Sequence, residues 1–147
     1  MSSNIRLTNP RVGQWLLALG ACLVGSAWGD DITGEQRFIC TAWHAISCST
    51  EGNCNQTEAW RLNMPDFLKV DLRARELATP EGSDQPRFTE IGSIERKEGR
   101  IFLNGSQQDR GYTWVINESS GEGTLAIVSD TTVVTLFTAC AASSRLQ

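Results

Sequence analysis

The most strand-like stretch of this chain is TVVTLFTAC, residues 132–140. It is rich in β-branched residues, which favour strands because their side chains fit a pleated surface. Successive side chains of a strand point to opposite faces, so Val134, Leu136 and Cys140 share one face. The stretch therefore predicts a buried strand that ends in an inward-facing cysteine.

Shorter runs with the same period of two precede this strand, separated by turn residues. Phe38, Cys40 and Ala42 predict a first strand by their alternation with Ile39 and Thr41. Further strands are expected in 58–62, 67–72, 88–96, 100–103, 112–117 and 124–128, with turns at 63–66, 97–99, 104–105 and 118–123. Residues 30–36 are expected to be a loose polar lead-in, and 73–87 a surface loop opening with a helical turn. The pattern predicts an all-β fold: a small antiparallel barrel or sandwich of about seven to eight strands, stapled by two disulfides.

The N-terminus has the anatomy of a secretory signal peptide. Arg6 and Arg11 precede an apolar core at 12–24, and Ala27 and Gly29 place small residues before Asp30. The sequence therefore predicts a signal peptide at 1–29 and a single exported β domain at 30–147, in the periplasm or cell envelope. No transmembrane segment is expected after processing.

An alternative route of export is lipidation. LGAC (19–22) resembles the lipobox of bacterial lipoproteins, which would anchor the protein at Cys22. A spanning helix is disfavoured, because it needs about 20 mostly apolar residues and this core is shorter and broken by glycines.

The charge balance of the expected domain is acidic. Removing residues 1–29 takes away two arginines and no acidic residue, which leaves 11 basic and 17 acidic residues and a net charge of −6. Such a surface is repelled by nucleic acid, so no nucleic-acid partner is expected.

Four cysteines remain after processing: Cys40, Cys48, Cys54 and Cys140. An even number in an exported chain predicts disulfides, and three pairings are open. The preferred pairing is Cys48 with Cys54, across a short polar loop, and Cys40 with Cys140, across the whole domain. The alternative is a Cys₃His zinc set with His44, but paired CxxC motifs are missing. No metal and no cofactor is expected.

Enzymatic motifs are missing from the sequence. There is no GxSxG and no nucleotide-binding glycine loop. Four carboxylates, those of Asp66, Asp71, Glu90 and Glu95, could pair for acid/base chemistry, but charges at alternate strand positions are typical of a solvated face. The chain is therefore expected not to be an enzyme.

The candidate partner-binding residues are Trp43, His44 and Trp60, which flank the Cys48–Cys54 loop. Tryptophan is enriched at binding hot spots, and a short disulfide loop loses little entropy on binding. The competing hypothesis is that both rings pack beneath the loop. Trp114 alternates with Tyr112 and Ile116 and is expected in the core.

Several segments resemble a group of small exported bacterial proteins of unknown function: FICTA (38–42), FLKVDL (67–72), GYTWVINE (111–118) and FTAC (137–140). That resemblance implies no activity. The plan of an early strand cysteine, a β-barrel and a terminal strand ending in cysteine is also similar to periplasmic C-type lysozyme inhibitors. Their inhibitory loop carries a Ser-Gly-rich motif before an aromatic residue, whereas SSGEG (119–123) runs into Thr124.

These observations favour an exported, non-enzymatic β domain that binds a protein or envelope ligand through its loops. A small-molecule or lipid-binding β-barrel is the first alternative, and a small envelope hydrolase is the second. An eight-stranded barrel is filled by its own side chains or holds one small ligand, so the first alternative leaves little interior volume for a ligand.

N-terminal sequencing of the exported protein is expected to begin at Asp30, because the small residues Ala27 and Gly29 stand where a signal peptidase reads. A blocked N-terminus at Cys22, with processing that globomycin inhibits, would instead establish the lipoprotein route.

Overall fold

The computed structural model describes residues 29–143, so all of the predicted signal peptide except Gly29 lies outside the described residues, as does Cys22. In the described part of the chain, ten strands and one short 3₁₀ helix are present: β1 (Arg37–Ser49), β2 (Cys54–Thr57), η1 (Ala59–Leu62), β3 (Phe67–Asp71), β4 (Glu76–Ala78), β5 (Phe88–Glu90), β6 (Ser93–Lys97), β7 (Arg100–Gln107), β8 (Arg110–Asn117), β9 (Glu122–Val128) and β10 (Thr132–Ala142). Among residues 29–143, no helix has the length and apolar character needed to cross a bilayer.

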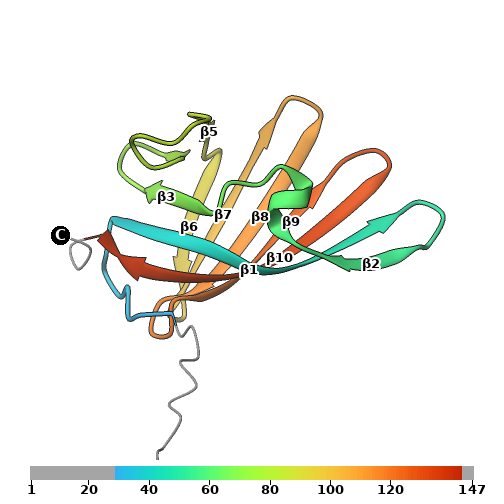
Figure 1. The fold of residues 1–147 in the computed structure, drawn as a ribbon. Coiled ribbons are helices and arrows are strands. Elements are labelled where there is room, and N and C mark those ends of the chain that lie inside the picture. The colour runs from blue at the N-terminus through green and yellow to red at the C-terminus, as the bar shows by residue number, and fades with distance from the viewer. Residues whose placement is uncertain (1–28, 144–147) are drawn as a thin grey trace, which may run out of the picture.

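The strands form one antiparallel sheet that curls into a half-barrel (Figure 1). The order across the sheet is β5-β4-β3-β1-β10-β9-β8-β7-β6, and β2 pairs with the second half of β1 beside β3. The prediction of an all-β antiparallel fold with two disulfides is confirmed, with somewhat more strands than the expected seven to eight.

The centre of the sheet is the pairing of β1 with β10, its two longest strands. In their register Cys40 lies opposite Cys140, and the two are joined by a disulfide with Cα atoms 4.0 Å apart. The second disulfide joins Cys48 to Cys54 across the β1–β2 hairpin, with Cα atoms 4.1 Å apart. Both preferred pairings are confirmed.

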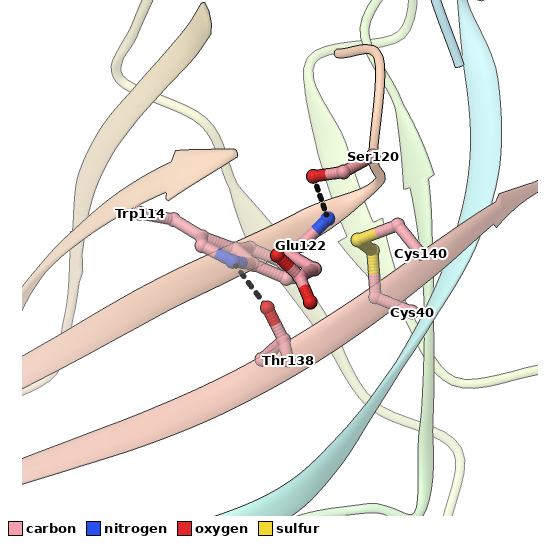
Figure 2. Close-up of a disulfide and its surroundings, with 6 residues drawn as sticks. All are labelled: Cys40, Trp114, Ser120, Glu122, Thr138 and Cys140. Carbon is pink, nitrogen blue, oxygen red and sulfur yellow. Dashed lines mark hydrogen bonds between the residues drawn. A yellow bond between two sulfur atoms is a disulfide. The ribbon is translucent and has the colours of Figure 1, made fainter. Parts of the chain in front are cut away.

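The core fills the concave side of the half-barrel, and Trp114 is its largest fully buried side chain. The Trp114 indole Nε1–H donates to Thr138 Oγ1 at 3.0 Å beside the Cys40–Cys140 disulfide (Figure 2), so its one polar atom is satisfied. Gly123 makes room for this contact, because a Cβ there would lie 2.8 Å from Thr138 Oγ1 and 2.9 Å from Trp114 Nε1. The expected core position of Trp114 is confirmed.

The lead-in at 30–36 was expected to be loose, and that prediction is wrong. Ile32 is fully buried, and its N–H donates to Glu118 O at 2.8 Å. The N–H of Asp30 donates to Cys140 O, also at 2.8 Å. Ile32, an apolar residue within a polar run, covers this end of the half-barrel. Burying an isoleucine side chain contributes about 1.5–3 kcal/mol to the free energy of unfolding.

Several other elements differ from the sequence predictions. The single strand expected at 88–96 is two strands, β5 and β6, at opposite ends of the sheet order, and β2 was not predicted. Residues 58–62 contain η1 instead of a strand, and 73–87 contains β4, whose Leu77 is buried in the core. The predicted turn at Asn104-Gly105 lies inside β7, where Gly105 pairs with Tyr112. A Cβ at Gly105 would lie 2.6 Å from the Tyr112 hydroxyl, so this glycine serves a close cross-strand approach instead of a turn.

Replacing both Cys40 and Cys140 with serine is expected to lower the free energy of unfolding by about 4–5 kcal/mol, because their bond spans 100 residues. The matched replacement of Cys48 and Cys54, which are six residues apart, is expected to cost about 2 kcal/mol. Urea denaturation of the two variants measures both losses. A larger loss from the Cys48/Cys54 pair would contradict this account of the β1–β10 seam.

Candidate binding face

A break in the β1–β10 register brings three rings together. The register shifts between Ala42 and His44, a β-bulge that sets two residues of β1 against one of β10. Trp43 and His44 therefore both lie beside Phe137. The ring centroids are 5.8 Å apart for Trp43 and His44, 5.9 Å for Trp43 and Phe137, and 6.0 Å for His44 and Phe137. These distances are typical of aromatic contacts, and the three residues are called the aromatic cluster.

The aromatic cluster lies on the convex face of the sheet, opposite the core. Ala45 and Leu136, which follow and precede cluster residues in the chain, are fully buried on the concave side. Trp43 is 60% exposed, while His44 and Phe137 are half-buried. The cluster is thus held from below by the sheet and open to solvent above.

The convex surface around the cluster carries formal charge only at two strand ends, at Arg37 of β1 and Glu122 of β9. Alternation along each strand identifies the outward residues between these ends: Ile39, Thr41, Trp43, His44, Ile46 and Cys48 on β1, Val133, Thr135, Phe137, Ala139 and Ala141 on β10, and Thr124, Ala126 and Val128 on β9. None is Lys, Arg, Asp or Glu. This surface, called the neutral strip, contrasts with the net charge of −6 over residues 30–147.

A shallow hollow of about 360 Å³ adjoins the cluster across β9 and β8. Trp43 and Phe137 line one side of it, Thr124 and Val115 its floor, and Arg100 and Glu122 bring charge to its border. The charged side chains begin where the neutral strip ends, which gives the strip a polar rim.

Trp60 lies apart from the aromatic cluster. It is on η1 and is also 60% exposed, with the Arg61 guanidinium 4.7 Å from its ring centroid. A hollow lined by His44, Gln56, Thr57, Glu58 and Arg61 adjoins the cluster at His44. Of the three candidate residues, the structure brings Trp43 and His44 together and places Trp60 on η1, outside the cluster. Neither tryptophan packs beneath the Cys48–Cys54 loop.

The sequence analysis missed Phe137. The sequence did contain a signal for it: residues 132–140 are apolar at both odd and even positions, since Val133 and Phe137 alternate with Val134 and Leu136. A strand that is apolar on both faces has a second face to bury, and β10 presents that face to solvent. The bulge that adds His44 to the cluster has no comparable sequence signal.

Of the four candidate carboxylates, that of Asp71 has a structural role. The carboxylate of Asp71 accepts hydrogen bonds from the backbone N–H of Ala74 at 2.9 Å and from Arg37 Nε at 2.6 Å. The hydrogen bond from Ala74 is the main cause that lowers the pKa of Asp71. Burial raises this pKa, and the hydrogen bond and positive charge of Arg37 lower it further. Asp71 thus holds the turn after β3, while Asp66, Glu90 and Glu95 lie on three other segments: the loop before β3, β5 and β6.

The cysteines contribute no metal ligand. All four cysteines of residues 29–143 are in disulfides, so His44 has no thiolate beside it for a Cys₃His set. Within the same residues, no group of three or more His, Cys, Asp or Glu side chains has the geometry of a metal site.

A second hollow lies on the concave side, between η1 and the inner face of β8 and β9. Its volume is about 200 Å³, and Tyr112 forms part of its wall. The Tyr112 hydroxyl donates to Glu90 O at 2.9 Å. Burial raises the pKa of Tyr112 to about 12, and the negative charge of Glu90 adds to the shift.

Comparison with known proteins gives no relative: no family model, curated protein or solved structure matches this chain.

Tyr112 is the single tyrosine of the chain, so tyrosinate absorbance reports on it alone. The native protein is expected to titrate near pH 12 and the urea-unfolded protein near pH 10. Because the folded pKa is the higher one, stability from this group is complete below pH 10 and is lost as the pH rises towards 12. Glu90→Gln should lower the native value, and a native value near 10 would show that the phenol is solvated.

Proposed function

We propose that this protein is an exported, non-enzymatic β domain that binds a protein or another envelope component through the neutral strip. The observation that carries the proposal is the 60% exposure of Trp43, in contact with His44 and Phe137 at the centre of an uncharged surface. A tryptophan that is 60% exposed on the convex face is not part of the buried core.

The composition of the neutral strip matches that of an interface. The centres of protein interfaces are depleted of charged residues and enriched in aromatic ones, with a polar rim around them. Soluble monomers rarely expose large contiguous apolar surfaces without a functional reason. Arg100 and Glu122 supply charge at the border of the strip.

The strip is also rigid, which favours binding. β1 and β10 each pair with neighbouring strands on both sides, and Cys40–Cys140 joins them to each other. A surface that is already ordered loses little conformational entropy when a partner docks. The aromatic cluster restricts the rotamers of Trp43 further, because two rings flank it.

The disulfides support export, because disulfides persist in oxidising compartments and this domain has two. Asp30, the residue expected to follow the cleavage site, donates its backbone N–H to Cys140 O of β10.

The absence of catalysis is proposed from the chemistry of the strip. His44 is its only titratable side chain, because Cys48 is in a disulfide. General acid–base or nucleophilic catalysis needs a second group acting with the first. A binding role requires no such pair.

The test compares aromatic truncations in the mature protein, immobilised for capture from an envelope extract. Trp43→Ala is expected to weaken capture of a specific component by at least about 10-fold, as for a hot spot, while the melting temperature stays close to wild type. Phe88→Ala is the matched control, because Phe88 is 71% exposed on β5, outside the strip. Trp60→Ala tests whether the contact extends to η1.

Equal capture by wild type and Trp43→Ala would overturn the proposal. A large fall in stability for Trp43→Ala would also count against it, because that ring would then serve packing. Trp114→Ala is the reference for truncation of a core ring, and it is expected to lower the free energy of unfolding by about 3–5 kcal/mol.

A further inference from the structure

The concave hollow is separated by the sheet from the neutral strip. It lies at the end of the half-barrel near η1, while Ile32 and the lead-in close the other end. Its apolar wall is made of Leu62, Met64, Leu68, Leu77, Leu125 and Ile127. Leu77 and Leu125 are buried and form the floor, and the others are half-buried.

The charged groups that line the hollow are all positive. Arg87 and Arg110 belong to the lining, which includes no Asp or Glu. Two arginines without an acid stand out in a domain with a net charge of −6. Acidic neighbours lie outside the lining: Glu90, which acts on the Tyr112 hydroxyl, and Asp109, 3.9 Å from Arg110 Nε. Asp66 and Asp84 line the adjoining hollow, which shares Arg87. The Asp109–Arg110 pair is exposed, and such pairs contribute little.

Arg87 is fixed in position at the edge of the hollow. Its Nη1 donates to Asn63 O at 2.6 Å, and its Nη2 donates to Asn63 Oδ1 at 2.9 Å. Asn63 is in turn the C-cap of η1, with its N–H donating to carbonyls of that helix. Because Ala59 of η1 is buried in the core cluster, η1 is a fixed wall.

The volume of the hollow sets the size of a ligand. About 200 Å³ is less than the roughly 300–1,000 Å³ of pockets for drug-sized molecules. It exceeds the roughly 150 Å³ of an engineered apolar cavity that binds benzene. One short alkyl chain or one ring therefore fits, and a phospholipid with two chains does not.

We propose that this hollow binds a small amphipathic carboxylate, with its apolar part on Leu77 and Leu125 and its head towards Arg110. The guanidinium group matches a carboxylate because its N–H donors form a planar fork. Burial of the apolar part contributes about 25 cal/mol per Å² of surface removed from water. The site is independent of the proposed partner surface on the convex face.

The experiment uses sodium octanoate and 1-octanol as probes of the mature protein, by calorimetry and by amide chemical shifts. Octanoate is expected to bind one to one and about 2- to 5-fold tighter than octanol, because Arg110 is exposed and an exposed ion pair is weak. The shifts should be centred on Leu77, Tyr112 and Leu125. Equal affinity for both probes, or shifts centred elsewhere, would overturn the assignment.

Three variants complete the test. Arg110→Gln is expected to remove most of the preference for octanoate, while Arg73→Gln, an exposed arginine outside this lining, should leave it unchanged. Met64→Trp should block both probes by filling the hollow, with its fold checked by thermal melting. Trp43→Ala should bind octanoate like wild type, so a failure of this site and a failure of the partner surface are distinguished.

Discussion

The antiparallel pairing of β1 with β10 is the contact on which the rest of the half-barrel depends. It joins two strands from opposite ends of the domain, and the Cys40–Cys140 disulfide fixes its register. From this seam the sheet extends through β3, β4 and β5 on one side and through β9 to β6 on the other. Closing so long a loop is entropically costly, and a covalent bond across it lowers the cost of folding by restricting the unfolded chain.

The two faces of this seam have different roles because strand side chains alternate. On the concave side Leu136 and Cys140 contribute to the core, and Thr138 satisfies the buried indole of Trp114. On the convex side Phe137 faces solvent with Trp43 beside it. The β-bulge in β1 leaves the core side of the seam intact and brings an additional ring to the outer face.

The two ends of the half-barrel also differ, for a reason that lies in single residues. The Ile32 side chain fills one end of the interior, and the backbone hydrogen bond from Asp30 to Cys140 O holds this segment in place. At the other end η1 packs against β1 without filling the interior, which leaves the hollow beside Tyr112. A neutral outer surface and a cationic inner hollow thus occur in one small acidic domain, on opposite sides of one sheet.

The sequence by itself determined the all-β fold class and the presence of disulfides, because period-two alternation and an even cysteine count are local or countable properties. It favoured the observed pairing among three without deciding it. It also indicated that Trp43 and His44 belong to one surface. Only the tertiary structure decided that Phe137 completes the cluster, that Asn104-Gly105 stays in a strand, and that Arg110 lines the inner hollow. Those outcomes depend on strand register and on the bulge, which arise from contacts between residues far apart in the chain and leave no periodic signal within any one segment.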